Sequence, residues 1–375
     1  MELTHKERIL AAVNHKPVDR IPTDMWATIE VQEKLMDHFG VEEGKGEADP
    51  CFGLNGSVLS RGVQGILALW DKMDIDGILF VRPPYIGPEY KVENEITYNE
   101  WGFGFRQSPY EYGTYEEQIV YPLSEIETLA EAEEYNWPDP DWYDYSALPG
   151  IISQCGGRAV CCGYSAAFTY HNYIRGMENS LMDPVLNPEI AQYIISRISD
   201  FFTEYHRRCF EAAGDMIDFN QVTDDWGSQN GLMTSPDIFY KFYREPMQRA
   251  IDLAKSYNIQ IFHHDDGDMR MLIPELIDMG VDVLNPIQWR CGDWDLISIK
   301  KEYGKKLCFH SAVDNQETLP MGSPEDVKKQ VMELIDTFAG DKTGFILGPC
   351  HNLQPNTSVE NILTLYKTAH EYGRF

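Results

Sequence analysis

The chain has 375 residues, 43% hydrophobic and 12% aromatic, which is enough to bury a sizeable core and suits one large α/β domain over residues 1–375. A formal net charge of −29 disfavours nucleic acid and anionic membrane surfaces as partners. No stretch is apolar enough to span a membrane, and the charged N-terminus does not match an export signal. We therefore expect a cytoplasmic protein with reduced cysteines.

The first third of the chain predicts the start of a barrel and then an insertion. We expect a helix at about residues 4–14, a strand at 20–26 and another strand at 76–81. Residues 85–145 are rich in Tyr, Trp, Pro and Glu and do not fit a repeat of strands and helices. This aromatic-rich stretch is interpreted as an insertion that contains a small β-hairpin, built from YNEWGFGFRQS and EEQIVYPL.

From about residue 150, short β-rich runs alternate with longer amphipathic stretches, as in repeated βα units. Ser235 and Ser323, each followed by proline, are expected N-caps, and Thr357 with Glu360 is a candidate capping box. Together with the two earlier strands, six runs predict a (β/α)8 TIM barrel: residues 158–164, 215–222, 259–265, 281–288, 305–313 and 343–350.

Polar side chains gather where these strands end, which is where barrel enzymes form their active sites. The residues at or just after a predicted strand end are Trp26, Tyr164, His171, Asn220, Gln221, Asp224, Asp225, His263, His264, Asp266, Asn285, Gln288, His310, Asp314, Cys350 and His351.

Three of these residues form a candidate metal site. His264 and Asp266 are two positions apart and so project to the same side, and Cys350 ends the last strand of the barrel. Imidazole, carboxylate and thiolate are suitable zinc ligands. The alternative is that His264 and Asp266 are only a hydrogen-bonded pair and that Cys350 packs in the core.

Asp224 and Asp225 are candidate catalytic groups, because two adjacent carboxylates raise the pKa of one of them. They could instead belong to a solvated loop that caps the helix beginning at Ser235. His310 and Asp314 could bind an anion, although no glycine-rich phosphate loop accompanies them. Seven residues are candidates for substrate binding, with core packing as the alternative for the aromatic ones: Trp26, Tyr164, Phe168, His171, Asn220, Gln221 and Trp226.

Five segments resemble the uroporphyrinogen decarboxylase-like superfamily: THKERILAAVNHKPVDRIP, MENSLMDPVLNPE, TDDWGSQNGLMTSPDIF, MRMLIPELIDMGVDVLNPIQ and GPCHNLQPNTSVENILTLY. The resemblance implies a (β/α)8 barrel and either decarboxylation or corrinoid-dependent methyl transfer. True decarboxylases of the superfamily carry an Arg-Gln-Ala-Gly-Arg-Tyr motif, where this chain has RIPTDMWAT. Arg20 is then the main cation nearby, so the octacarboxylate substrate is not expected.

The methyltransferases of the superfamily carry a zinc-binding His-x-Cys and a second Cys some eighty residues on. His264 matches that histidine, Asp266 stands in place of the first Cys, and Cys350 matches the last. A carboxylate in place of a thiolate makes a zinc site harder and a better Lewis acid toward oxygen.

The resemblance therefore implies the first methyltransferase of an O-demethylase system, with Asp224, Asp225 and His264 as its catalytic residues. It would move a methyl group from a methoxylated aromatic to cob(I)alamin. The cobalamin would be carried by a separate corrinoid protein, since this chain has no Asp-x-His-x-x-Gly motif. The alternatives are another methyl donor or a thiol acceptor, a decarboxylase of a small carboxylate, and a non-catalytic ligand-binding barrel. A homodimer is possible.

Overall fold

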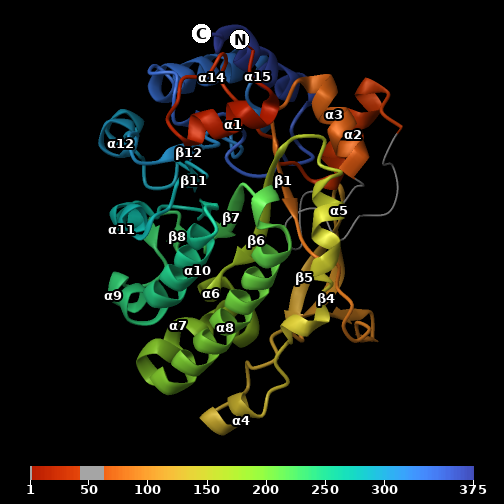
Figure 1. The fold of residues 1–375 in the computed structure, drawn as a ribbon, viewed down its shortest axis with the longest axis vertical. Helices are drawn as coiled ribbons and strands as arrows, with labels where there is room; N and C mark the ends of the chain where they lie inside the picture. The colour runs from red at the N-terminus through yellow and green to blue at the C-terminus, as the bar shows by residue number, and fades with distance from the viewer. Residues whose placement is uncertain (1, 43–62) are drawn as a thin grey trace.

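The computed structural model describes residues 2–42 and 63–375, and Cys51 lies outside these ranges. Its centre is a curled sheet of seven parallel strands, in the order β1-β6-β7-β10-β11-β12-β13 (Figure 1). These strands lie in or next to the predicted runs: β1 (Ile78–Val81), β6 (Ala159–Ser165), β7 (Phe219–Val222), β10 (Gln260–His264), β11 (Val283–Asn285), β12 (Cys308–His310) and β13 (Phe345–Ile346). The α/β barrel class expected from the sequence is confirmed.

The segment predicted as the first strand, residues 20–26, closes the sheet. It forms isolated parallel bridges toward the β13 side, Thr23 with Leu347 and Ala27 with Leu353. On its other side the backbone amides of Asp76 and Gly77, just before β1, donate to the Thr23 carbonyl at 3.1 and 3.0 Å. The segment thus occupies the place of the eighth strand, without forming a continuous ladder.

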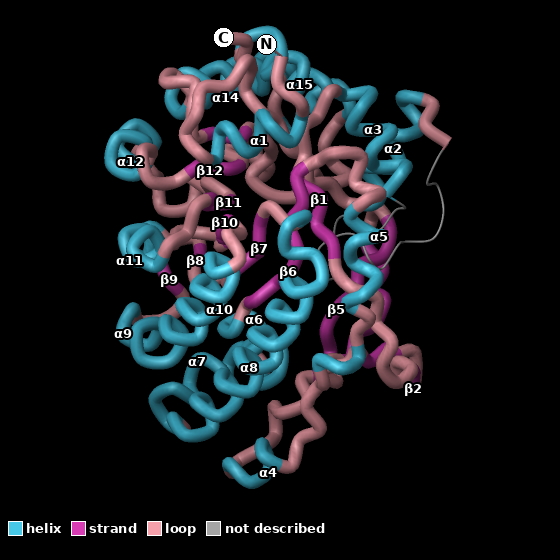
Figure 2. The backbone as a smooth tube through the Cα atoms, in the orientation of Figure 1, coloured by secondary structure: helices cyan, strands magenta, loops and turns pink. Residues whose placement is uncertain are grey.

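Helices surround this sheet, as Figure 2 shows in cyan around magenta strands. The longest of them bury one apolar face against the sheet and its neighbours, which is the pattern that a barrel of parallel strands requires. The helices are α1 (His5–Val13), α2 (Ile29–Phe39), α3 (Val63–Met73), α4 (Leu129–Glu133), α5 (Leu148–Ile152), α6 (Ala167–Arg175), α7 (Met177–Leu186), α8 (Pro188–Ala213), α9 (Pro236–Ile238), α10 (Arg244–Ser256), α11 (Ile273–Met279), α12 (Leu296–Tyr303), α13 (Thr318–Met321), α14 (Pro324–Phe338) and α15 (Val359–Tyr372).

Two of the three predicted helix starts are confirmed, because Ser235 and Ser323 cap α9 and α14. The predicted capping box of Thr357 and Glu360 is wrong by one residue. The cap of α15 is Ser358, whose hydroxyl accepts from the amide of Asn361. The reason is a turn before the helix, in which the Thr357 amide bonds back to the Gln354 carbonyl and the Thr357 side chain is buried.

The insertion forms a four-stranded antiparallel sheet rather than a hairpin alone. Its strands are β2 (Val92–Glu93), β3 (Ile96–Tyr98), β4 (Gly104–Tyr110) and β5 (Gly113–Val120). Outside the insertion, β8 (Gly227–Ser228) pairs with β9 (Gly231–Leu232) in a separate two-stranded ribbon. Trp101 anchors the insertion, since its ring lies 4.8 Å from that of Phe201 on α8 and 4.9 Å from that of Tyr170 on α6. The insertion therefore packs against α6 and α8, beside the ends of β1 and β6.

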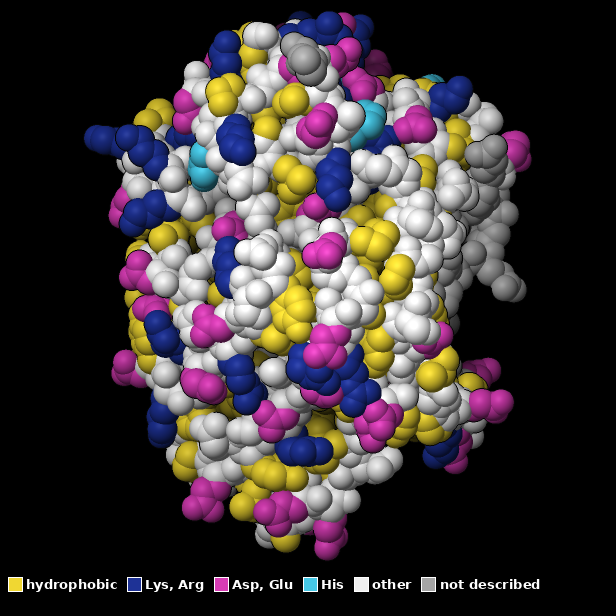
Figure 3. All heavy atoms as spheres, viewed as in Figure 1, with side chains coloured by type: hydrophobic (Ala, Val, Ile, Leu, Met, Phe, Trp, Pro, Cys, Tyr) yellow, Lys and Arg dark blue, Asp and Glu magenta, His cyan; other side chains and the backbone are white. Residues whose placement is uncertain are grey.

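The surface carries both signs of charge, and Figure 3 shows acidic and basic side chains interspersed over the face in view. Within the described residues, no helix has the combination of length and apolar character that crossing a bilayer demands.

A buried ion cluster holds the closing segment at the amino-terminal end of the strands. The Asp76 carboxylate, fully buried, accepts from Arg8 Nη1 at 2.6 Å, Arg20 Nη1 at 2.8 Å and the Thr23 amide at 2.9 Å. Burial alone would raise the pKa of Asp76, but His5, Arg20 and Arg8 together bring that pKa below its usual value. One carboxylate thus joins α1, the closing segment and the start of β1.

Replacing this carboxylate should destabilise the fold strongly. Asp76→Ala leaves two buried guanidinium groups, Arg8 and Arg20, without their shared partner, so we expect a loss of about 3–5 kcal/mol in the free energy of unfolding. Urea denaturation measures this loss. Glu333→Ala, which removes an exposed helical pair with Lys329, is the matched control and should have little effect. Equal stability of the two variants would contradict the role given to Asp76.

The contribution of Asp76 should also depend on pH. A carboxylate whose pKa is lowered on folding stabilises the protein above its unfolded pKa of about 4, and this stabilisation is lost as pH falls through the folded pKa. The difference in free energy of unfolding between wild type and Asp76→Asn should therefore be constant from pH 7 to 5. It should shrink below about pH 4. A difference that grows on acidification would contradict this assignment.

Candidate functional site

The strand-end residues converge at the carboxyl-terminal rim of the barrel. His264 ends β10, Asp225 follows β7, Asp266 follows β10 and His351 follows β13. His264 Nε2 lies 3.7 Å from Asp225 Oδ1 and 3.8 Å from Asp266 Oδ1, and His351 Nε2 lies 3.6 Å from Asp266 Oδ2. His263 alternates to the other side, where its Nδ1 meets the Val222 carbonyl at 2.8 Å.

His264, Asp266 and His351 fit a metal ion. One ligand atom from each lies within 4.8 Å of the others, and this is the one such group of three found in residues 2–42 and 63–375. Ligands at about 2.0–2.2 Å from a tetrahedral zinc ion are about 3.3–3.6 Å apart, close to the separations seen here. Asp266 Oδ1 is buried and has no hydrogen-bond partner among the described residues, as expected of an oxygen that a cation would satisfy.

The charge around His264 also favours a cation. Burial lowers the pKa of His264, but the carboxylates of Asp266 and Asp225 outweigh burial and leave that pKa above its usual value. His351 is less ready to bind, because its Nδ1 accepts from the Asn352 amide at 2.7 Å and the proton of the neutral ring is therefore on Nε2. Ligation through Nε2 therefore requires the proton to move to Nδ1, which breaks the hydrogen bond from the Asn352 amide.

Cys350, predicted as the third ligand, is not part of the group. Its thiol donates to the Ile287 carbonyl at 3.4 Å, and burial raises the pKa of Cys350 well above its ordinary value. Cys350 and His351 lie in the bend after β13, where the Cys350 thiol packs toward Ile287 and the His351 ring lies toward Asp266. The third position predicted for Cys350 is thus taken by its neighbour.

Asp224, predicted to be catalytic, caps a helix instead. It is 2% exposed, and its carboxylate accepts from the amides of Phe168 and Thr169 at the start of α6, at 3.2 and 2.9 Å. Burial raises the pKa of Asp224 well above its usual value. Of the two predicted carboxylates, Asp225 alone reaches the rim, where its side chain is 43% exposed beside His264.

The predicted substrate residues separate into two that reach the rim and five that lie in the core. Trp26 packs between His264, His351 and Phe80, with ring centroids 5.5, 6.0 and 5.7 Å away. Tyr164 lines a cavity. The other five side chains are buried in the core. Phe168 stacks on Trp226 at 4.1 Å, His171 Nδ1 bonds the Tyr243 hydroxyl, Asn220 donates to the Cys162 carbonyl, and Gln221 is 1% exposed.

His310 and Asp314 do not form the anion site considered from the sequence. His310 Nε2 bonds Asp24 at 2.9 Å, and Asp314 accepts from the amides before and at the start of α13 and pairs with Arg290. Each side chain is therefore satisfied inside the protein.

A cavity of about 740 Å³ lies between the insertion and the ends of β1 and β6. Seven tyrosines, Trp101 and several phenylalanines line it, and its charged lining residues within the described ranges are Arg82, Glu100 and Glu116. Glu100 accepts from the hydroxyls of Tyr143 at 2.8 Å and Tyr90 at 3.2 Å. Sequence reasoning missed this wall, whose only signal was the unusual aromatic content of the insertion.

The cavity is connected to the His264 group through two packed rings, although none of the three residues of that group lines it. Phe80 lines the cavity and packs edge-on against Trp26, which in turn contacts His264. Burial, and then the Asp225 carboxylate, raise the pKa of the cavity residues Tyr164 and Tyr173. Both tyrosines are therefore neutral hydrogen-bond donors.

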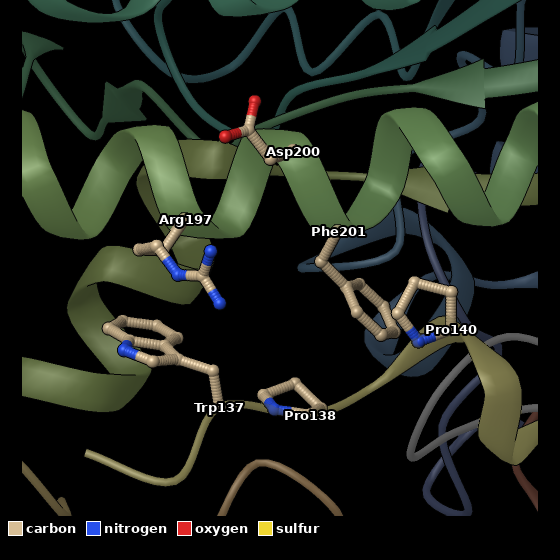
Figure 4. Close-up of a pocket in the computed structure, with 6 residues that line it drawn as sticks. All are labelled: Trp137, Pro138, Pro140, Arg197, Asp200 and Phe201. Carbon is tan, nitrogen blue, oxygen red and sulfur yellow. The ribbon is translucent and has the colours of Figure 1, made fainter. Parts of the chain in front are cut away.

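A smaller hollow of about 170 Å³ lies on the outside of α8 (Figure 4). Its lining residues include Trp137 and Arg197, whose guanidinium carbon lies 5.7 Å from the indole centroid. None of the strand-end residues lines it. It is a surface notch and not part of the rim site.

Comparison with known proteins gives a family and a fold. The family model "Uroporphyrinogen decarboxylase (URO-D)" matches residues 111–372. Uroporphyrinogen decarboxylases of Chlorobium phaeobacteroides and Carboxydothermus hydrogenoformans are 22% and 23% identical over 61% of this chain, and the matches span 64% and 63% of their own lengths. A solved methyltransferase from Methanosarcina mazei superposes with a TM-score of 0.68 at 18% identity, covering 99% of both chains, and so shares the fold.

The metal site can be tested by direct measurement. We expect purified protein to bind one zinc ion per chain by elemental analysis, and His264→Ala or Asp266→Ala to lose it, because each removes a ligand atom of the group. Cys350→Ala is the matched control and should retain zinc, since its thiol bonds Ile287. Loss of zinc in Cys350→Ala, with retention in His264→Ala, would reverse the assignment.

Proposed function

The chain belongs to the uroporphyrinogen decarboxylase family, and from this premise we propose that it is a corrinoid-dependent methyltransferase. It takes the methyl group of a methoxylated aromatic compound and transfers it to the cob(I)alamin of a separate corrinoid protein. The observation that carries the proposal is the His264 group at the rim, which the packed rings of Trp26 and Phe80 connect to a large aromatic cavity with little positive charge.

The charge of the cavity argues against a polycarboxylate substrate. A substrate with many carboxylates needs several cations around it, whereas the charged residues that line this cavity within the described ranges are one arginine, Arg82, and two glutamates, Glu100 and Glu116. Glu100 is also held in place by two tyrosine hydroxyls, so it is a fixed part of the wall. Decarboxylation of uroporphyrinogen, the reaction named for the curated relatives, is therefore not the activity that we propose.

The shape and lining of the cavity favour a flat aromatic donor. A volume of about 740 Å³ is within the range of small-molecule sites, and aromatic side chains supply faces and edges for stacking. Trp101 of the insertion and Tyr170 and Tyr173 of α6 present such rings to the cavity. A methoxylated aromatic bound here would have its rim-side end near Tyr164 and Asp225.

In the proposed reaction the carbon–oxygen bond of the ether breaks. The methyl carbon accepts the electron pair of cob(I)alamin, and the ether oxygen leaves as a phenolate that retains the bonding pair. That oxygen must be stabilised as negative charge develops on it. His264, Asp266 and His351 would hold zinc, which when bound supplies a Lewis acid for oxygen.

The remaining rim residues would position the metal ligands and stabilise the leaving phenolate. Asp225 accepts from the Asp266 backbone amide at 3.3 Å and so fixes the turn that carries this ligand. Tyr164 and Tyr173, whose pKa values are raised, stay protonated and can donate hydrogen bonds to a phenolate oxygen. Trp26, packed on His264 and His351, excludes water from one side of the group.

The donor class can be tested with free cob(I)alamin as acceptor, by measuring methylcobalamin formation from the absorbance spectrum. We expect transfer from a neutral methoxyphenol such as 2-methoxyphenol, and weaker use of 4-methoxybenzoate, whose carboxylate would face Glu100 and Glu116. Glu100→Gln should raise kcat/KM for the benzoate relative to the phenol by about tenfold, equivalent to about 1.4 kcal/mol.

Glu133→Gln on α4, which does not line the cavity, is the matched control and should leave this ratio unchanged. Methanol, methylamines and methyl thiols complete the donor screen. Transfer from one of these but not from methoxyarenes would replace the proposed donor. Release of CO₂ from a small carboxylate, without methyl transfer, would favour a decarboxylase.

A further inference from the structure

A buried chain of hydrogen bonds runs from the metal group into the barrel. His264 Nδ1 lies 2.6 Å from Asn285 Oδ1, Asn285 Nδ2 lies 2.7 Å from His310 Nδ1, and His310 Nε2 lies 2.9 Å from Asp24 Oδ2. Asn285, His310 and Asp24 are each at most 1% exposed. The four side chains come from the ends of β10, β11 and β12 and from the closing segment, so the chain crosses the rim.

Chemistry fixes the direction of every bond in this chain. The Asp24 carboxylate only accepts, so His310 Nε2 must carry a proton and donate to it. In the neutral ring His310 Nδ1 then accepts, and two donors face it, Asn285 Nδ2 and the Ser311 hydroxyl at 2.9 Å. Because the Asn285 amide nitrogen points to His310, its oxygen points to His264 and accepts from Nδ1–H.

These bond directions determine the tautomer of His264, at the other end of the hydrogen-bond series. With its proton on Nδ1, the neutral His264 ring has its lone pair on Nε2, the atom that faces Asp266 and Asp225. A metal can bind only the nitrogen that has a free lone pair. We propose that Asp24 is a positioning residue for the metal site: acting through His310 and Asn285, it selects the tautomer in which His264 can bind zinc.

The proposal rests on the metal site of the proposed function but not on methyl transfer. It predicts that an isosteric change three hydrogen bonds away reverses the whole chain. In Asp24→Asn the new side-chain oxygen can still accept from the amides of Met25 and Ile78, as Asp24 Oδ1 does. The amide nitrogen, however, now donates to His310 Nε2. The His310 proton moves to Nδ1, the Asn285 amide turns over, and the His264 proton moves to Nε2, where it blocks the metal.

A second substitution should restore the original direction. With Asn285→Asp, both carboxylate oxygens accept, so His264 donates from Nδ1 whatever His310 does. The double variant Asp24→Asn/Asn285→Asp has the same net charge as wild type, with the carboxylate moved along the chain. It should therefore recover the metal-binding tautomer that the single variant loses.

The test is the zinc affinity of the full chain, measured with Zn²⁺ alone by competition against a chromophoric chelator. We expect Asp24→Asn to bind zinc about 10–100-fold more weakly than wild type, as is usual when a partner of a ligand is lost. The double variant should return to within about threefold of wild type. Asp218→Asn, which alters a nearly buried carboxylate at the start of β7 away from this chain, should leave the affinity unchanged.

Three results would overturn the inference: a folded Asp24→Asn with wild-type affinity, a double variant that stays weak, or a wild-type chain that binds no zinc. If Asp24→Asn does not fold, Asn285→Asp and Asn285→Leu repeat the test, since the first should keep zinc and the second lose it, and equal affinities would refute the proposal. A wild-type chain that binds zinc but transfers no methyl group would end the proposed function and leave this inference standing.

Discussion

Closure of the barrel by one extended segment is the constraint on which the rest of the structure depends. Residues 20–27 make only isolated bridges toward β13, so side chains must supply much of what holds the segment in place. At one end of the barrel Arg20 and Thr23 bond the buried Asp76. At the other end Asp24 bonds His310, and Trp26 packs on His264. The same eight residues therefore close the sheet and support the site.

Much of this architecture follows from the sequence, because apolar runs and helix caps are local signals. The strand pattern of the sequence alone predicts that His264, Asp266, Cys350 and His351 lie at the rim, after the runs that form β10 and β13. The sequence could not predict that His351, and not Cys350, belongs to the group, since this depends on which of the two neighbours turns toward Ile287. A strand end is located by pattern, but its facing side is set by tertiary packing.

The other departures have the same physical origin. Asp224 and Asp225 are equivalent in sequence, yet the start of α6 offers two free amides to Asp224 and leaves Asp225 at the rim. The cavity depends on contacts between Trp101 of the insertion and helices some seventy to one hundred residues later, and composition indicated only that aromatic residues are frequent there. Contacts between distant segments have no periodic signature, so the wall that carries Glu100 became visible only in the fold.

The methyltransferases that the sequence resembles bind zinc with two thiolates. The predicted ligand set of this chain retains one thiolate, and the ligand set in the structure departs further from that pattern. The group contains His351 where Cys350 was predicted, so two imidazoles and a carboxylate face one another, and within residues 2–42 and 63–375 no sulfur belongs to it. Soft thiolate ligands suit the activation of a thiol, whereas nitrogen and oxygen ligands leave a zinc ion harder and more attracted to oxygen. An ether oxygen is a substrate atom of that kind. The aromatic cavity, lined by two carboxylates and one guanidinium, is connected to this group through Phe80 and Trp26. The preference of the ligands for oxygen and the preference of the cavity for an uncharged aromatic ring therefore favour the same class of donor.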